Sequence, residues 1–536
     1  MISDRKLPLG IQNFEKLRKE NCVYIDKTQF VWKLSSTPSS YFLSRPRRFG
    51  KSLFLSTLEA YFLGKKELFK GLAIEKLEEA EACSREIWQT YPVFYLDLNA
   101  EVYNELKDLT SRLNLFLSYG EEVYGKNIEE KTFAQRFEGI IKRAYIKTGK
   151  QVVILVDEYD KPLLQTMNKN ETLNEDYRNI LKAFFTAIKS SDKYLRFAFL
   201  TGVTKFSKIS VFCDLNNLQD ISMLYNYGEI CGISQEELED NFKPEIEGLA
   251  ENGSISIDKA LLTLKQKYDG YRFNEKSKGV YNPFSLLNAF SSGELKNFWF
   301  TTGTPAFLID FLKKARYNIP DLDGNVRMDE AGLNSYRAEF AQPVPILFQT
   351  GYLTIKDYNT ESKLYTLGFP NDEVRYGFLN NLLPAYTSIP QDRTGISVWN
   401  FVEEIQNANI DGFMQNLKSI VSGIPYDNFS EKDLNLREQN YQAAIYLIFA
   451  LMNQFVETEV HSLAGRADCV VQTQDAVYLF ELKLSKEASS EDAVLQIKEK
   501  NYSEKYKPSG KKIFAIGTSF DERLRTIKDW KTERLL

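Results

Sequence analysis

Histidine is almost absent from this sequence, which contains one, His461, among 536 residues. We therefore expect neither a cluster of histidine metal ligands nor a Ser-His-Asp triad. Cysteine is also sparse, and its five residues show no paired spacing. This distribution argues against both a disulfide framework and a zinc site. It favours a reducing compartment, and we expect the cytoplasm.

Long hydrophobic runs are missing as well. The longest, Ala443–Met452, is too short to span a bilayer and is typical of a buried helix. The first residues lack the apolar core of a signal peptide, so no membrane association is expected. The formal net charge is −5, which means that any contact with nucleic acid must be local. The length and the content of 43% hydrophobic and 26% charged residues predict a globular chain of about three domains.

A strand-to-helix stretch near the N-terminus has the pattern of a phosphate-binding loop. It runs from a short apolar strand around 41–43 into Gly50, Lys51 and Ser52, and then into an apolar helix over 53–62. The backbone N–H groups of such a loop and the positive end of its helix bind polyphosphate. Lys51 is then expected to reach the β- and γ-phosphates, and the Ser52 hydroxyl to bind Mg²⁺.

The loop departs from the general pattern at one position. That pattern has glycine five residues before Gly50, where this chain has Arg45. Without further support, the stretch could equally be a surface loop with a helix that starts at Ser44 or Ser52. The residues expected to bind the nucleotide are Arg48, Phe49, Gly50, Lys51, Ser52 and Leu53, together with Asp157 and Thr201.

An apolar run over 152–156 ends in two carboxylates, Asp157 and Glu158. A buried parallel strand that delivers acids at its C-terminal end has this pattern. Asp157 is expected to hold Mg²⁺ directly or through water, and Glu158 to polarise the attacking water. Further apolar strands are predicted at 92–98 and 195–202, and a long helical stretch at about 101–148. Together these elements predict a parallel α/β sheet covered by helices.

The stretches Ser44–Leu53 and Val156–Pro162 closely resemble bacterial AAA-ATPase-like proteins that carry a C-terminal PD-(D/E)XK-type nuclease domain. In that family the first glycine of the loop is absent as a rule, so Arg45 fits it. The resemblance covers most of the chain and is thinnest from about 305 to 439. Further matching stretches are Tyr24–Thr28, Thr201–Thr204, Asn216–Asp220, Tyr268–Phe273 and Tyr281–Phe284.

The resemblance implies an ATPase of the AAA-like kind that uses ATP and Mg²⁺. In related ATPases a polar residue at the end of the fourth strand senses the γ-phosphate, and Thr201 matches that place. A threonine that only fills the strand end is the alternative. A neighbouring subunit could supply an arginine finger, but the sequence does not point to one. A homo-oligomer is among the partners that we consider.

A second group of polar residues lies near the C-terminus. Glu481 and Lys483 are two residues apart in an apolar strand, so both side chains point to one face. Asp468 lies near the end of the preceding strand, and a hairpin would bring the two carboxylates together. Two close carboxylates suit Mg²⁺, and the metal activates a water that Lys483 can position. A solvated sheet face or a structural Glu–Lys pair is the alternative.

This group also resembles the Asp…Glu-x-Lys pattern of PD-(D/E)XK nucleases. The resemblance adds the helix acid Glu438 and Gln496 as further catalytic residues, and it places Gln442 where many relatives have histidine. A local phosphate-binding surface is expected from the lysines at 498, 500, 505, 507, 511 and 512.

We therefore predict three domains: an ATPase at 1–230, a helical or winged middle module at 231–395, and a restriction-endonuclease-like α/β domain at 396–536. The predicted function is ATP hydrolysis that gates or positions a Mg²⁺-dependent nuclease acting on DNA or RNA. One alternative is a non-cleaving nucleotide switch whose nuclease fold only binds nucleic acid or a partner. A nucleotide kinase is another, but it leaves the C-terminal residues unexplained.

Overall fold

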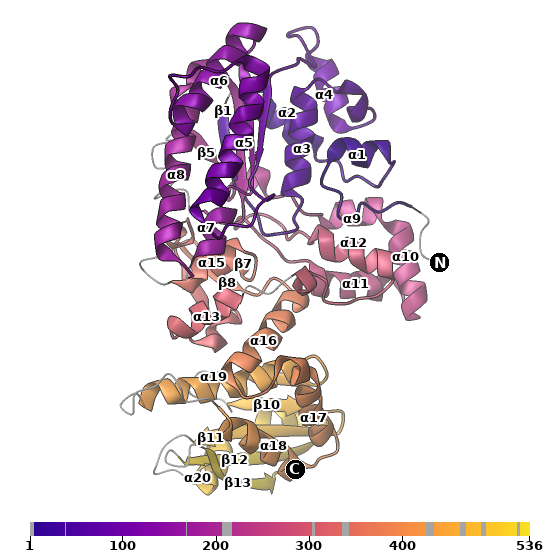
Figure 1. Ribbon diagram of the computed structural model, residues 1–536. Helices are drawn as coiled ribbons and strands as arrows, with labels where there is room; N and C mark the ends of the chain where they lie inside the picture. The colour runs from indigo at the N-terminus through magenta and orange to yellow at the C-terminus, as the bar shows by residue number, and fades with distance from the viewer. Residues whose placement is uncertain are drawn as a thin grey trace. The chain divides into compact units, whose positions relative to one another are not determined.

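The computed structural model (Figure 1) describes residues 5–37, 39–167, 169–205, 217–302, 306–334, 342–424, 434–460, 468–483, 489–521 and 526–536. Its contacts divide the chain into two compact units. The first comprises Met1–Thr302 and Gly324–Glu373, and the second comprises Gly303–Asp323 and Val374–Leu536. The two units are described separately below.

A parallel five-stranded sheet forms the centre of the first unit, in the order β2-β3-β4-β1-β5. Every residue of β3 is buried, as its apolar run predicts. The sequence-based expectation of a covered parallel sheet is therefore confirmed. Because β4 lies between β1 and β3, the loops that follow these two strands flank its C-terminal end. The strands are β1 Ser39–Ser44, β2 Val93–Asp97, β3 Val152–Asp157, β4 Leu195–Gly202 and β5 Leu218–Asp220.

Helices cover both faces of this sheet. Helices α5, α6 and α8 pack together on one face, and α3 lies on the other with α1, α2 and α4 (Figure 1). Their bounds are α1 Phe14–Lys19, α2 Thr28–Ser35, α3 Lys51–Phe62, α4 Ala73–Glu81, α5 Leu106–Tyr124, α6 Phe133–Thr148, α7 Lys161–Thr166 and α8 Glu171–Ser190.

The single long helical stretch expected at about 101–148 is wrong, because it is two helices. Gly125 has a φ of 95°, which ends α5. A capping box of Thr132 and Gln135 then starts α6, and Gly149 in the left-handed region ends it.

The middle of the chain is helical, as expected, and its residues up to 302 and from 324 to 373 also belong to the first unit. Ser234 and Glu237 form the capping box that the sequence predicts. The helices here are α9 Gln235–Asn241, α10 Lys243–Gly253, α11 Ile257–Tyr268 and α12 Pro283–Ser292, followed after residue 324 by α14 Glu330–Asn334 and α15 Pro343–Gln349. A small antiparallel sheet, β6-β8-β7, consists of β6 Val326–Met328, β7 Thr354–Asn359 and β8 Leu364–Gly368.

The second unit contains a mixed five-stranded sheet in the order β13-β12-β11-β10-β9. Strands β10 and β11 form an antiparallel hairpin, while β11 and β12 are parallel and are joined through α20. The strands are β9 Glu457–Val460, β10 Cys469–Gln472, β11 Ala476–Lys483, β12 Lys512–Asp521 and β13 Thr526–Arg534. The helices are α13 Ala306–Lys314, α16 Asp372–Tyr386, α17 Thr394–Gln406, α18 Ile410–Ser422, α19 Leu434–Met452 and α20 Ser490–Glu499.

Within the described residues, no helix combines the length and the apolarity needed to cross a bilayer. The mixed α/β fold class is confirmed, with its parallel N-terminal sheet, helical middle and mixed C-terminal sheet. The three-domain division at 230 and 395 stays a prediction.

Candidate nucleotide and metal sites

The loop between β1 and α3 positions the first group of residues. Gly50 has a φ of 92°, a conformation that favours glycine, and it precedes the twelve-residue helix α3. Lys51 is buried, and its Nζ donates to the carbonyl oxygens of Arg45 at 3.1 Å and Pro46 at 3.2 Å. Its ammonium group therefore lies inside the curve of the loop, at the positive end of the helix.

The two acids that follow β3 lie beside this loop. The Lys51 Nζ is 3.4 Å from Glu158 Oε1. Asp157 is 3% exposed, and the nearby Ser52 side chain acts to lower the pKa of its carboxyl group. Burial, followed by the charge of Glu158, raises the pKa of Asp157 to about 6. The structure thus brings Lys51, Ser52, Asp157 and Glu158 together.

Two buried oxygen atoms at this edge of the sheet have no hydrogen-bond partner among the described residues: Asp157 Oδ1 and Thr201 Oγ1. Thr201 lies near the end of β4, where it is paired with Leu43 of β1, and its carbonyl accepts from Tyr159 N at 3.1 Å. A buried oxygen without a partner is costly unless a further group binds it. The Asp157–Ser52 pair, with its spare oxygen, fits a hard divalent cation such as Mg²⁺.

A cavity of about 420 Å³ opens over the loop, and all of its lining residues belong to the first unit. The expected residues Arg48, Phe49, Gly50, Lys51, Ser52, Leu53 and Glu158 line it. Among the lining residues that the sequence analysis did not predict are two cations, Arg47 and Lys161. The only signal for them was their place next to the two motifs. Asp157 and Thr201 lie at the sheet edge and are not lining residues of this cavity.

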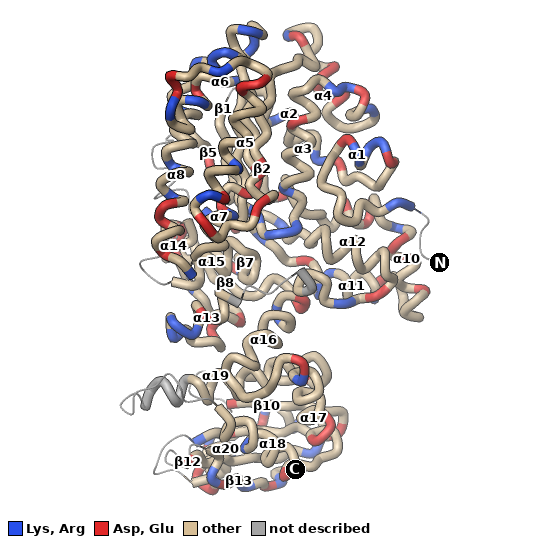
Figure 2. The backbone as a smooth tube through the Cα atoms, viewed as in Figure 1, with Lys and Arg blue, Asp and Glu red and all other residues tan. Residues whose placement is uncertain are grey.

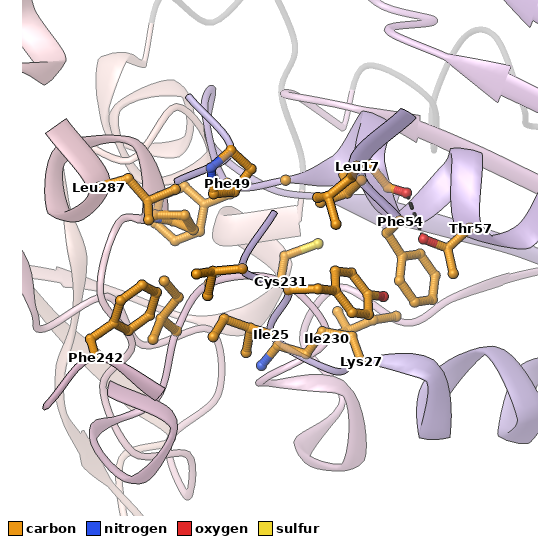
Figure 3. Close-up of a pocket in the computed structure, with 18 residues that line it drawn as sticks. Leu17, Ile25, Lys27, Phe49, Phe54, Thr57, Ile230, Cys231, Phe242 and Leu287 are labelled. Carbon is orange, nitrogen blue, oxygen red and sulfur yellow. Dashed lines mark hydrogen bonds between the residues drawn. The ribbon is translucent and has the colours of Figure 1, made fainter. Parts of the chain in front are cut away.

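A smaller, mostly apolar cavity of about 100 Å³ adjoins the first. The two share lining residues at Phe49, Gly50 and Leu53. Ile25 and Phe242 line it, as Figure 3 shows, together with Cys231. Burial raises the pKa of the Cys231 thiol, so this thiol is not in its reactive form.

Arg45, the residue in place of the first glycine, lines neither cavity. Its buried guanidinium donates to the carbonyl oxygens of Ser44, Ser222 and Tyr227, each at 2.8 Å, and lies 3.9 Å from the Phe273 ring centroid. Burial lowers its pKa to about 10. Arg45 therefore anchors the base of the loop.

The second group of residues is assembled on β11 and α20. Gln496 Nε2 donates to Glu481 Oε1, and Lys483 Nζ donates to Gln496 Oε1. Lys483 Nζ is also 3.4 Å from Glu481 Oε1. Asp468 Oδ2 accepts from the backbone N–H of Leu482 at 2.7 Å. Four of the five predicted nuclease residues thus lie together, while the side chain of Glu438 lies outside the described residues.

The electrostatics of this group favour a cation. Glu481 is 4% exposed, and its Oε2 has no hydrogen-bond partner among the described residues. Burial, followed by the charge of Asp468, raises the pKa of Glu481 to about 7. The spare oxygen and the nearby carboxylate fit Mg²⁺, which uses few protein carboxylates and keeps several waters. No third His, Cys, Asp or Glu side chain completes a metal-binding group among the described residues.

Several of the expected phosphate-binding lysines are paired with acids. Lys498, Lys505 and Lys507 form ion pairs with Glu533, Glu459 and Glu504, respectively. Basic and acidic residues are accordingly interspersed in this part of the chain (Figure 2). The charge of Lys500 acts on Glu481 and lowers its pKa somewhat. Gln442 is exposed on α19.

Comparison with known proteins gives two domain matches. Residues 8–212 match the family model described as "Predicted AAA-ATPase", and residues 436–530 match that of the PD-(D/E)XK nuclease superfamily. A full-length relative is described as "Uncharacterized protein in vnfD 5'region" of Azotobacter chroococcum mcd 1. It is 34% identical to this chain over 539 residues, covering 100% of both proteins.

Proposed function

Because the chain belongs to the family of AAA-ATPase-like proteins with a C-terminal PD-(D/E)XK nuclease-superfamily domain, we propose that it hydrolyses ATP to gate or position a nuclease. One observation is the main support for the proposed ATP hydrolysis. Lys51, Ser52, Asp157 and Glu158 meet at one sheet edge, and Asp157 there keeps a buried oxygen without a partner among the described residues.

In the proposed reaction, the phosphates of ATP draw the Lys51 ammonium away from the loop carbonyls and from Glu158. Glu158 then accepts a proton from the attacking water. The water oxygen bonds to the γ-phosphorus, and the bond from that phosphorus to the bridging oxygen breaks with its electron pair on ADP. Mg²⁺ held by Ser52 and Asp157 would neutralise charge on the phosphate oxygens. The Thr201 hydroxyl would donate to the terminal phosphate.

The adjoining apolar cavity suits the adenine base. It begins where the phosphate cavity ends, at Phe49 and Leu53, and its wall is mostly apolar. Binding sites of this kind bury a flat ring against apolar side chains.

We propose that the second group of residues cleaves phosphodiester bonds in DNA or RNA. Asp468 and Glu481 would hold Mg²⁺, which would activate the attacking water. Lys483 would orient that water. Gln496 hydrogen-bonds with both Lys483 and Glu481 and so fixes their relative positions. Glu438 is proposed to assist. We place this activity in the cytoplasm, in keeping with the few dispersed cysteines.

One observation favours the non-cleaving alternative. Only two carboxylates meet among the described residues, and three of the expected surface lysines are already paired. A nucleotide switch that binds nucleic acid without cutting it is therefore the second candidate.

Two variants test the ATPase, with calorimetric ATP binding and phosphate release as readouts. Lys51→Ala should lower ATP affinity by about tenfold to a hundredfold, the size of a lost charge-assisted hydrogen bond. Glu158→Gln should keep the affinity and slow hydrolysis by at least about tenfold. The exposed residues Lys189 and Glu171 supply the matched controls Lys189→Ala and Glu171→Gln. Wild-type turnover in Glu158→Gln would place the catalytic carboxylate elsewhere.

Incubation with plasmid, single-stranded DNA and RNA tests the nuclease half, with and without ATP and Mg²⁺. Metal-dependent cutting supports cleavage. Retention of nucleic acid without cutting supports the switch.

A further inference from the structure

Four cationic side chains line the 420 Å³ cavity among the described residues: Arg47, Arg48, Lys51 and Lys161. The Arg48 guanidinium lies 5.0 Å from the Phe284 ring centroid, which gives it an aromatic partner. The cations that line this cavity therefore differ in whether the protein already provides them with a partner.

Both lysines have protein partners. Lys51 donates to two loop carbonyls and lies 3.4 Å from Glu158. Lys161 Nζ donates to Asn99 O at 2.5 Å and to Asn99 Oδ1 at 3.0 Å. Arg47, by contrast, is exposed, and it takes part in no side-chain hydrogen bond or ion pair of the described structure. Its guanidinium thus keeps all of its donors for a ligand.

The backbone that carries Arg47 is fixed on both sides. Pro46 before it packs so closely on Gly351 that a Cβ at residue 351 would lie 2.7 Å from the proline ring. The Phe49 ring that follows packs on Tyr271 and Phe273, with centroids 4.7 and 5.7 Å apart. A side chain on so restrained a loop can reach a ligand without a large loss of backbone freedom.

The charges around Arg47 match a triphosphate. The positive charge of Arg47 is among the causes that lower the pKa of Lys161, after partial burial, which places the two cations near each other. Glu158 contributes one carboxylate to the cavity wall against these cations. A multiply charged anion would neutralise the excess positive charge of the cavity wall. A guanidinium can also donate to two oxygens of one phosphoryl group.

We propose that Arg47 contacts the terminal phosphate of the bound nucleotide from within the same chain. This role rests on the proposed function and adds to it. The site then needs no arginine from a neighbouring subunit. Arg47 would stabilise the charge that gathers on the terminal phosphoryl oxygens as the bond to the bridging oxygen breaks, while Lys51 spans the β- and γ-phosphates.

The test compares the binding of two nucleotides by the full chain. Calorimetry with Mg²⁺ would measure the affinity for ADP and for a non-hydrolysable ATP analogue with an imido bridge. In Arg47→Ala we expect a loss of about tenfold to a hundredfold for the analogue and less than about threefold for ADP. Arg47→Lys should lie between wild type and Arg47→Ala. Arg393→Ala, which removes an exposed arginine of the second unit, is the matched control.

A mixing experiment distinguishes the same chain from a neighbour. Arg47→Ala protein combined with Glu158→Gln protein should not regain phosphate release, because neither chain has a complete site. Recovery in the mixture would overturn the assignment to the same chain.

Equal losses for both nucleotides, or unchanged affinities, would also overturn the role of Arg47 and leave the proposed ATPase standing. A wild type that binds neither nucleotide would remove the proposed ATPase and, with it, the role of Arg47. Since Arg47 is exposed, unchanged melting of each variant is expected.

Discussion

Glu373 is a buried carboxylate that belongs to neither proposed site. It is fully buried and accepts from the backbone N–H of Trp299 at 2.9 Å. Its second oxygen, Oε2, has no partner among the described residues. Burial is the largest cause that raises its pKa from 4.5 to about 6. A carboxyl group in this setting stabilises the fold most when it is protonated.

The stability of the first unit should therefore fall as pH rises through this window. Between pH 4.5 and 6 the folded state binds more protons at Glu373 than the unfolded state does, so deprotonation costs about 2 kcal/mol of unfolding free energy. In Glu373→Gln this loss should vanish. Between pH 4.5 and 7, the unfolding free energy of the variant should therefore rise relative to that of wild type by the same amount. Calorimetric melting at both pH values measures the difference.

The exposed residue Glu236, which pairs with Lys278, provides the control. Its pKa is lowered, first by that pairing. Glu236→Gln should therefore show a small pH effect of opposite sign. Parallel pH profiles of wild type and Glu373→Gln would show that Glu373 does not titrate in this way.

The sequence was sufficient to bring Lys51, Asp157 and Glu158 to one place, because parallel strands end at the same sheet edge. It did not reveal Arg47 or Lys161. The direction of a loop side chain depends on local backbone turns, and both Arg48 and Glu158 adopt positive φ values, 67° and 50°. Such turns redirect the neighbouring side chains and leave no periodic pattern in the sequence.

Helix α20 lies unusually close to strand β12 because of a glycine. A Cβ at Gly517 would lie 2.2 Å from Ser490 O and 2.8 Å from Val494 N. Gly517 is paired with Glu481 across the parallel strands. The close approach of the helix is therefore what lets Gln496 reach Glu481 and Lys483.

Gly517→Ala should push α20 away from the sheet and separate Gln496 from Glu481. We expect a loss of about 1–3 kcal/mol in stability, as in other overpacked sites, and loss of any metal-dependent cutting. Melting of the second unit and plasmid cleavage are the two measurements. Gly395→Ala is the control, because a Cβ there meets no atom within 4 Å in helix α17, and it should be neutral or slightly stabilising. If Gly517→Ala melts like wild type and still cuts, the close approach of α20 to β12 is not needed to position Gln496.

The strands themselves could be predicted from their apolar runs, but their order could not. Nothing in residues 195–202 indicates that β4 inserts between β1 and β3, since strand order depends on crossover connections and the packing of helices. The break at Gly125 was missed because one glycine is tolerated within a helical pattern.

At the scale of the whole molecule, the two proposed activities lie in separate compact units. The resemblance to a known family predicted both. The place of residues 324–373 did not follow from it, because these residues join the first unit only through contacts between distant parts of the chain. Lys205, for example, donates to Asn334 Oδ1 at 2.7 Å.

Changes at the proposed nuclease site should therefore leave the proposed ATPase activity intact. Asp468→Ala and Glu481→Ala should abolish cutting, because a single carboxylate is too poor a ligand set for Mg²⁺. Lys483→Ala should keep metal binding and lose most of the rate. Phosphate release without nucleic acid should match wild type in all three.

Melting of the same three variants separates this interpretation from a structural ion pair. A structural pair predicts lower melting temperatures in each variant, since a buried charge loses its partner, together with a wild type that never cuts. Stable variants without cutting support the catalytic role.

The buried guanidinium of Arg45 has an evolutionary consequence. A single change to glycine would leave an empty volume under Phe273 and deprive three carbonyl groups of their donors. A lineage that carries this arginine can therefore acquire the common glycine only if the residues around it change as well. Motif searches that require the first glycine will pass over chains with this loop.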